Sequence, residues 1–226
     1  MTTTQQPLTR EQIADLMARR LERGWLVNLG VGMPTLISNY VRPEQEIIFT
    51  SENGVIGYAG LAKPEEQDPD IVNAGVQPVT LNPGAAIVHH ADSFALIRRG
   101  LNDVTVLGAY EVACDGTFAN WRTSTEPFDQ LGGIGGAMDL AMGAKQVWIA
   151  MEHTTREGEP RLLERCTLPL TGGNRVRLVV TDVAVVAVHE GRFVLEEHAP
   201  GFSVEDIRAI TGAPLDVSPN LHEVAL

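Results

Sequence analysis

A carboxylate among small polar residues is the strongest candidate for chemistry in this chain of 226 residues. Glu52 stands in Ser51-Glu52-Asn53-Gly54, directly after an apolar segment that ends at Thr50. Asn-Gly is a strong turn dipeptide, so the tetrad predicts that Glu52 is displayed where a strand ends. A carboxylate displayed in this way can act as a nucleophile and form a covalent intermediate. Taken alone, the tetrad also fits a surface hairpin with an incidental glutamate.

A first glycine loop, Gly30-Val31-Gly32, follows an apolar strand and precedes a helix whose first turn holds Pro34. Such a turn directs backbone N–H groups toward an anion. It resembles the dinucleotide fingerprint, although Thr35 stands where the third glycine belongs, and Glu52 follows about 20 residues after Gly32, where a ribose-binding acid is expected. A nicotinamide-dependent dehydrogenase of the Rossmann type is therefore one alternative. A tight turn without a ligand is another.

A second glycine loop covers residues 132–136 and precedes a helix expected at 137–143. Glycines lose much conformational entropy when they are ordered, so this composition favours a place where a ligand must approach the backbone closely. The amides of Gly135 and Gly136 are candidates to bind the oxyanion of a tetrahedral intermediate. A flexible connector is the alternative interpretation.

Two segments with histidine, His89-His90 and Glu152-His153, could be interpreted as part of a metal site or a catalytic triad, but neither pattern is specific. His89 and His90 are adjacent, and adjacent imidazoles neither point the same way in a strand nor share a helix face. Ser93 follows them without a G-x-S-x-G elbow, so no triad is predicted. Glu152-His153 lacks a second ligand pair at suitable spacing. We therefore predict no metal site, and we take His89 and His90 either as part of a substrate-contacting loop or as functionally silent.

Strands and helices that alternate along the chain must position these residues. Thr9 and Gln12 have capping-box spacing and begin an amphipathic helix that Gly24 ends. Further helices are expected at 93–99, 137–143 and 203–211, and residues 59–70 read as a surface loop. Strands are expected at 25–29, 46–50, 77–81, 104–107 and 147–151, with two more within 177–188. This order predicts an α/β fold whose open sheet is mostly parallel, becomes mixed in the second half and is flanked by helices.

Length, composition and charge restrict the number of domains and the kinds of partner. A hydrophobic content of 44% in a chain of this length predicts a single domain over residues 1–226. The net charge of −12 argues against nucleic acid and against an anionic membrane as partners. We see no apolar run of about 18 residues and no export signal, so we expect a cytoplasmic protein with Cys114 and Cys166 as free thiols.

Taken together and in order, several motifs resemble the B subunits of family I CoA-transferases, which act on 3-oxoacids. The resemblance covers about residues 9–190, and its motifs are Asn28-Leu29-Gly30-Val31-Gly32-Met33-Pro34, Ser51-Glu52-Asn53-Gly54, Asn73-Ala74-Gly75, Leu81-Asn82-Pro83-Gly84-Ala85, Ala119-Asn120-Trp121, Gly135-Gly136-Ala137-Met138-Asp139-Leu140 and Thr167-Leu168-Pro169-Leu170-Thr171-Gly172.

The resemblance implies a CoA-transferase (NagB/RpiA-like) fold and a specific mechanism. Glu52 would be the nucleophile, Gly136 N–H an oxyanion donor, and Asn28 a neighbour of the reacting thioester. The loop from Gly30 to Gly32 would help to build the pocket, with Ser51, Asn53 and Gly135 as further binding residues. Coenzyme A would be a substrate and part of a covalent intermediate, and no cofactor would be bound permanently. A separate A (alpha) chain, usually in an α2β2 assembly, would be the partner.

Two departures from the family pattern concern local packing and coenzyme A binding, and one segment concerns specificity. Thr50 stands where the family usually has His or Gln, and Val76 stands where it usually has Lys after Asn-Ala-Gly. The segment from His89 to Phe94 resembles the branch that acts on 3-oxoadipate more than the acetoacetate branch, and two imidazoles can hold a second carboxylate. We therefore expect CoA transfer from succinyl-CoA to a 3-oxoacid, with 3-oxoadipate favoured. Acetoacetate or another short-chain acid as acceptor, and a non-catalytic scaffold subunit, are the alternatives.

Overall fold

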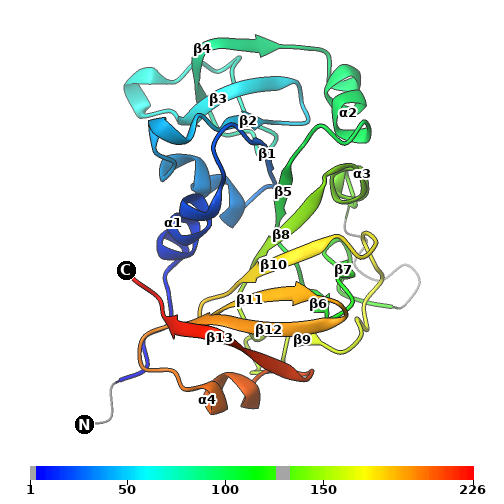
Figure 1. Ribbon diagram of the computed structural model, residues 1–226. Helices are drawn as coiled ribbons and strands as arrows, with labels where there is room; N and C mark the ends of the chain where they lie inside the picture. The colour runs from blue at the N-terminus through cyan, green and yellow to red at the C-terminus, as the bar shows by residue number, and fades with distance from the viewer. Residues whose placement is uncertain (1–3, 126–132) are drawn as a thin grey trace.

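A ten-stranded sheet runs through the computed structural model, which describes residues 4–125 and 133–226 (Figure 1). Its strand order is β13-β12-β11-β10-β8-β5-β1-β2-β3-β4, and a smaller sheet has the order β7-β6-β9. The bounds of the strands are β1 Leu26–Leu29, β2 Ile48–Thr50, β3 Val55–Leu61, β4 Val79–Ile87, β5 Val104–Leu107, β6 Glu111–Ala113, β7 Phe118–Ala119, β8 Gln146–Ala150, β9 Leu162–Leu163, β10 Val176–Val180, β11 Ala184–His189, β12 Arg192–His198 and β13 Leu215–Glu223.

Helices connect and cover the strands. The helices are α1 Arg10–Arg20, α2 His90–Arg98, α3 Ala137–Gly143 and α4 Val204–Ala209, with the 3-10 helices η1 Met33–Asn39, η2 Pro43–Gln45 and η3 Pro64–Glu66. The predicted capping box of α1 is confirmed, because Gln12 N donates to Thr9 Oγ1 at 3.3 Å and Thr9 N donates to Gln12 Oε1 at 2.8 Å. The helix expected after the first glycine loop is the 3-10 helix η1. Pro34 at its start suits such a short, tight turn.

The centre of the large sheet is parallel, and antiparallel pairs flank it on both sides, with a parallel β12–β13 pair at one edge. β2, β1, β5, β8 and β10 run parallel to one another. β3 and β4 add an antiparallel extension on one side, while β11 pairs antiparallel with β10 and with β12 on the other. The predicted α/β class with an open, mostly parallel and partly mixed sheet is therefore confirmed. Because parallel neighbours end at the same edge, residues that follow β1, β2, β5 and β8 come together in space.

Two hydrophobic cores lie on opposite faces of this parallel centre. Val104 and Val106 of β5 belong to the core under α1 and η1, whereas Leu107 faces the core with Ile97 of α2 and Leu140 of α3. Each face of the sheet is thus covered by helices, which explains why these strands read as nearly continuous apolar runs. Complete burial of one such side chain contributes about 1.5–3 kcal/mol.

The differences from the sequence-based expectations lie mainly outside the parallel centre of the sheet. β3 extends into the stretch 59–70 that we expected to be a loop, and β4 continues to Ile87, beyond the strand expected at 77–81. β12 and β13 were not predicted at all, although β13 has nine residues. β13 lies at the edge of the sheet, is mostly exposed and contains Pro219, so its sequence lacks a strong apolar pattern.

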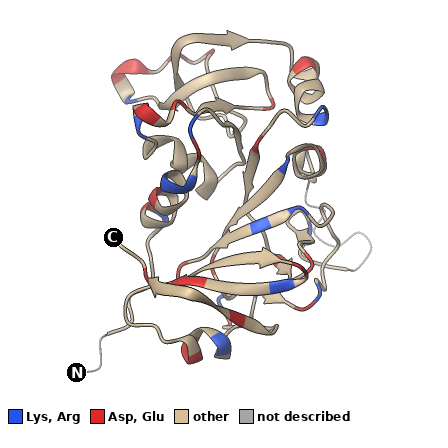
Figure 2. Ribbon diagram, in the orientation of Figure 1, with Lys and Arg blue, Asp and Glu red and all other residues tan. Residues whose placement is uncertain are grey.

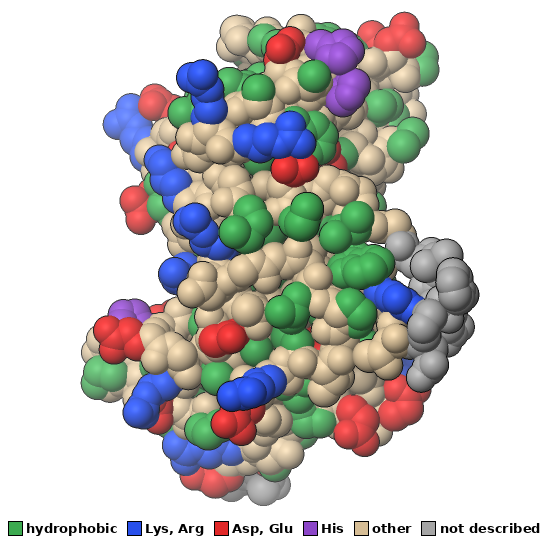
Figure 3. Space-filling model, turned by 90° about the vertical axis from the view of Figure 1, so that its right-hand side faces the viewer, with side chains coloured by type: hydrophobic (Ala, Val, Ile, Leu, Met, Phe, Trp, Pro, Cys, Tyr) green, Lys and Arg blue, Asp and Glu red, His purple; other side chains and the backbone are tan. Residues whose placement is uncertain are grey.

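Charged side chains of both signs are interspersed along the chain (Figure 2). Figure 3 looks onto the side of the molecule that carries α2 and α3, where hydrophobic side chains form a band across the middle. Exposed apolar residues of α3 include Met138 and Met142. Within residues 4–125 and 133–226, no helix combines the length and the apolar character that a membrane span requires.

Candidate active site

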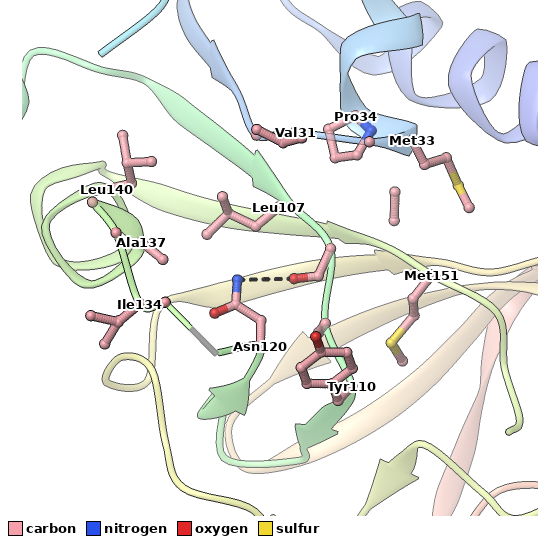
Figure 4. Close-up of a pocket in the computed structure, with 18 of the residues that line it drawn as sticks. Val31, Met33, Pro34, Leu107, Tyr110, Asn120, Ile134, Ala137, Leu140 and Met151 are labelled. Atoms are coloured by element: carbon pink, nitrogen blue, oxygen red, sulfur yellow. Dashed lines mark hydrogen bonds between the residues drawn. The ribbon is translucent and has the colours of Figure 1, made fainter. Parts of the chain in front are cut away.

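A cavity of about 610 Å³ lies at the C-terminal edge of the parallel strands. Gly30 follows β1, Glu52 follows β2 within the next turn, Gly108 follows β5 and Met151 follows β8, and all four line the cavity. Figure 4 shows Val31, Met33 and Pro34 from the first glycine loop on one side, with Ile134, Ala137 and Leu140 on the other. This edge is where open α/β sheets bind their ligands. The cavity brings together Glu52, Gly30, Gly32, Gly135 and Gly136, which are distant in sequence.

Glu52 is held in the turn of the hairpin formed by β2 and β3. Ser51 N donates to Val55 O at 2.8 Å, and Gly54 N donates to Ser51 O at 2.9 Å. Gly54 has a φ of +118°, and a Cβ atom there would overlap the carbonyl oxygen of Val88. Glycine is therefore required at this turn. The hairpin interpretation of the tetrad is correct for the backbone, and the half-buried Glu52 nevertheless lines the cavity.

Asn28 connects Glu52 to the sheet. Its side chain is completely buried on β1, and its Nδ2 donates to Thr50 O at 3.1 Å and to Glu52 Oε2 at 3.4 Å. The Asn28 Oδ1 atom has no hydrogen-bond partner in the described part of the protein. A buried acceptor without a hydrogen-bond partner is energetically costly. From its place on β1, the Asn28 amide orients the Glu52 carboxylate.

Tyr58 of β3 lies within the electrostatic influence of Glu52. Burial raises the pKa of the Tyr58 hydroxyl well above its usual value of 10, and the neighbouring negative charge of Glu52 raises it further. Tyr58 is therefore neutral at physiological pH. Its ring stacks on Phe49 at 5.4 Å between centroids and closes the core beneath the hairpin.

Ser51 and Asn53 fasten the turn and do not line the cavity. The buried Ser51 Oγ accepts from Ala74 N at 2.8 Å, and the Ser51 carbonyl accepts from Ser93 Oγ of α2 at 3.2 Å. Asn53 Nδ2 donates to Val72 O at 2.8 Å. The Asn73-Ala74-Gly75 motif of the sequence thus braces the Glu52 turn from outside. Direct binding of substrate by Ser51 or Asn53 stays a prediction.

The two glycine loops face the cavity from opposite sides. Gly32 has a φ of +95°, a conformation that favours glycine, and its carbonyl accepts from Thr35 N at 3.2 Å and Thr35 Oγ1 at 2.7 Å. The backbone and the side chain of Thr35 thus both bond to the carbonyl of Gly32, the residue before η1. The position of the missing third glycine is filled by a residue with a local structural role.

Gly136 must be glycine because of space rather than conformation. Its φ of −88° and ψ of 3° are open to other residues, but an added Cβ would lie 2.6 Å from Phe94 Cζ and 2.9 Å from Phe94 Cε1. The ring of Phe94 in α2 thus sets how closely the second loop approaches. Within the described residues, the Gly136 N–H donates to no other backbone group. Gly135 has a φ of +52°, and Gly132 of the same loop lies outside the described residues.

The two histidines considered as substrate contacts do not line this cavity. His89 caps α2, where its Nδ1 accepts from Ala91 N at 3.2 Å, and its ring lies 4.4 Å from that of His90. His90 lines a second cavity of about 330 Å³, together with Phe94, Arg98 and Gly136. A role for His89 and His90 in binding a second carboxylate stays a prediction. The structure places His89 at the start of α2 and His90 in the second cavity, which Gly135 and Gly136 also line.

Sequence reasoning assigned no specific role to Asn120, which lines the cavity (Figure 4). Asn120 Nδ2 donates to Gly108 O at 3.1 Å, and Asn120 Oδ1 accepts from Thr171 Oγ1 at 2.7 Å. Asn120 and Thr171 belong to motifs of the family resemblance, so the sequence pointed to both residues but indicated a specific role for neither. Arg10, Glu152 and Arg161 also line the cavity and were not predicted as site residues. Nothing in their local sequence distinguishes them from surface charges.

His153 is a buried structural residue. Its Nδ1 and Nε2 atoms lie 3.0 Å and 2.9 Å from the hydroxyl oxygens of Thr181 and Thr211. Burial lowers the pKa of His153 to about 4, so its ring is neutral at physiological pH. The described residues contain no group of three or more His, Cys, Asp or Glu side chains arranged to hold a metal ion.

Fold and site together define a class of α/β protein that presents a carboxylate at the edge of parallel strands, opposite a glycine-rich loop. The chain belongs to the coenzyme A transferase family, whose profile matches residues 10–209. It is 42% identical to the B subunit of 3-oxoadipate CoA-transferase from Pseudomonas putida, over 95% of this chain and 99% of the relative. It is 43% identical to the beta subunit of acetate CoA-transferase from Haemophilus influenzae, over 96% of each chain.

A solved structure agrees with the fold. Glutaconate coenzyme A-transferase from Acidaminococcus fermentans superposes with a TM-score of 0.68 at 20% identity, covering 98% of this chain and 91% of that one. This likeness bears on the fold alone. The family membership itself makes the chain a CoA-transferase chain and decides against the nicotinamide-dependent dehydrogenase. The similarity of Gly30-Val31-Gly32 to a dinucleotide fingerprint reflects a shared strand-to-helix turn.

Proposed function

We propose that this chain is the B subunit of a 3-oxoacid CoA-transferase that uses Glu52 as its nucleophile. The observation that carries the proposal is the position of Glu52, which lines the same cavity as Gly135 and Gly136 and accepts a hydrogen bond from Asn28. A carboxylate nucleophile suits the reaction because coenzyme A must be held on the enzyme while one acid leaves and another enters.

The proposed reaction begins at the acyl-CoA carbonyl. A Glu52 carboxylate oxygen attacks that carbon, the C–S bond breaks, and CoA leaves as the thiolate. The thiolate then attacks the Glu52 carbonyl of the mixed anhydride, the anhydride C–O bond breaks, and the first acid leaves as its carboxylate. Glu52 now carries CoA as a thioester. The acceptor acid repeats the two steps in reverse, which restores the free carboxylate and predicts ping-pong kinetics.

Each attack creates a negatively charged oxygen that needs donors. The Gly136 N–H is the proposed donor, since Gly136 lines the cavity and its N–H has no backbone acceptor among the described residues. Loss of one such donor typically costs about 2.7–4 kcal/mol in the barrier. Asn28 donates to Glu52 Oε2 and is the proposed neighbour of the reacting thioester. The Gly30–Gly32 loop forms the adjoining wall.

The proposed donor is succinyl-CoA and the favoured acceptor is 3-oxoadipate. The name of the Pseudomonas putida relative and the His89–Phe94 segment support this choice. The Haemophilus influenzae relative is named for acetate and is equally similar, so an acetate- or acetoacetate-type transferase is the second candidate. Both relatives are named as one subunit of their enzyme, which supports an A (alpha) chain as partner, and we propose an α2β2 assembly.

A single experiment tests the nucleophile. The complex of both subunits is incubated with succinyl-CoA and no acceptor, digested, and searched by mass spectrometry for CoA on the peptide that contains Glu52. The adduct is expected in the wild type and absent in Glu52→Ala. Near wild-type turnover by Glu52→Ala would exclude the mechanism, and a wild-type complex without adduct or transfer would favour the scaffold alternative. Initial rates with 3-oxoadipate, acetoacetate and acetate then rank the acceptors.

A further inference from the structure

Two arginines and a glutamate form a charged cluster in the wall of the Glu52 cavity. Arg10 at the start of α1, Glu152 just beyond β8 and Arg161 all line the cavity. Glu152 Oε1 lies 3.5 Å from an Nη of Arg10, and Glu152 Oε2 lies 3.3 Å from an Nη of Arg161. Among the described residues, Arg10 and Arg161 are the basic side chains and Glu52 and Glu152 the acidic side chains that line this cavity.

Arg161 has unused hydrogen-bonding capacity that faces solvent. Its side chain is 21% exposed, and within the described chain its one hydrogen bond goes to Glu152. A guanidinium carries five N–H donors. The Nε and second Nη atoms of Arg161 are neither bonded nor fully enclosed. By contrast, the exposed Arg98 makes two hydrogen bonds to Asp139 at 2.9 and 3.0 Å. Arg161 is thus a partly desolvated cation with donors left for another anion.

The cluster lies across the sheet from the nucleophile. Glu52 follows β2 and Glu152 follows β8, and β1 and β5 lie between them. Three strand spacings of about 4.8 Å place the two strand ends roughly 14 Å apart. Glu52 lines the cavity after β2, and Arg161 lines it beside Glu152. The space between them suits a short acyl chain whose carbonyl meets Glu52 and whose far end meets a guanidinium.

A dicarboxylic acyl group needs such a cation. Its second carboxylate would otherwise sit in a cavity that already contains the negative charge of Glu52, within a protein of net charge −12. Arginine matches a carboxylate in a planar, two-point geometry. His89 does not line this cavity, and His90 lines the separate cavity behind Gly136.

We infer that Arg161, with Arg10 beside it, binds the distal carboxylate of a dicarboxylic acyl group and so selects dicarboxylic over monocarboxylic substrates. The inference rests on the proposed function, because it assigns the substrate class of the same cavity. Glu152 bridges the two guanidinium groups and partly neutralises them when the cavity is empty. An entering carboxylate takes the unused donors of Arg161.

The test compares two donors that share coenzyme A and differ at the acyl end. The complex of both subunits is assayed with succinyl-CoA and acetyl-CoA, and succinate and acetate binding is measured by calorimetry. Arg161→Met should lower kcat/KM for succinyl-CoA about ten- to hundredfold and weaken succinate binding in proportion. The kcat/KM for acetyl-CoA, which in a ping-pong reaction does not depend on the acceptor, should stay close to wild type. Arg161→Lys, which keeps the charge but not the two-point geometry, should recover part of the loss.

Arg192→Met is the matched control. Arg192 also contacts a single carboxylate, Asp216 at 3.2 Å, but it lies on β12 and does not line the cavity. Arg192→Met should change kcat/KM for neither donor. The double variant His89→Ala and His90→Ala tests the rival assignment and should preserve the preference for succinyl-CoA.

Several outcomes overturn the inference. An equal loss with both donors assigns Arg161 to the phosphates of coenzyme A or to stability. An unchanged ratio in Arg161→Met, or a preference lost in the histidine variant instead, excludes the role of Arg161. Failure of the proposed function looks different: no CoA adduct forms in the wild type from either donor, while calorimetry still reports whether succinate binding depends on Arg161.

Discussion

The packing of Phe94 against Gly136 allows one substitution to test how the second glycine loop is positioned. Gly136→Ala adds a methyl group where Phe94 Cζ and Cε1 would lie at 2.6 and 2.9 Å. Real Cβ contacts are not this close, so either the ring or the loop must move. The backbone of Gly136 has φ −88° and ψ 3°, so the substitution introduces no conformational strain of its own.

The expected magnitude has two parts. Overpacking at a tight contact costs about 1–3 kcal/mol of stability. Displacement of the Gly136 N–H from its place at the cavity removes an oxyanion donor, which corresponds to about 10²- to 10³-fold in kcat. Gly133→Ala is the matched control, since it adds the same methyl group to the same loop with nothing within 4 Å. The control should leave the free energy of unfolding almost unchanged.

A double-mutant cycle assigns the effect to the contact. Phe94→Leu removes the ring atoms that the new methyl group would meet. The double variant Gly136→Ala, Phe94→Leu should therefore be more stable than the sum of the single effects predicts, by about 1 kcal/mol or more. Urea denaturation gives the stability, and the initial rate of CoA transfer by the two-subunit complex gives kcat. Wild-type stability and kcat in Gly136→Ala, or strict additivity in the cycle, would refute the reasoning.

Two further predictions concern stability. Val76 is 77% exposed and has a φ of +59°, which is strained for a β-branched residue, so Val76→Gly should raise the free energy of unfolding by about 1 kcal/mol in urea denaturation, and a decrease would contradict the strain. The pKa of His153 is lowered from 6.5 to about 4, so the unfolded chain binds more protons between these values, and stability should be complete above pH 6.5 and fall by up to about 3 kcal/mol as the pH drops to 4. His153→Gln should remove this part of the pH dependence, measured as the difference between the two proteins in thermal unfolding across that pH range.

Local patterns were sufficient for the parallel half of the fold. Val104–Leu107 and Ala137–Gly143 were predicted with the bounds that the structure has, because apolar runs and caps are local signals. The turn at Glu52 was predicted from Asn53-Gly54 for the same reason. Strands outside the parallel centre were missed where their residues are exposed at a sheet edge, as in β13, since such strands depend on a partner rather than on their own pattern.

The sequence by itself determined the family, the class of fold and the carboxylate most suited to the chemistry. Only the tertiary structure decided which distant residues share its cavity. Glu52, Gly136 and Arg161 lie far apart in the chain, and they line one cavity at the edge where the parallel strands end. Likewise, only the structure showed that His90 lines the second cavity and that Arg161 lines the same cavity as Glu52. Spacing along a chain records local conformation, whereas a binding site depends on contacts whose sequence separation carries no periodic signal.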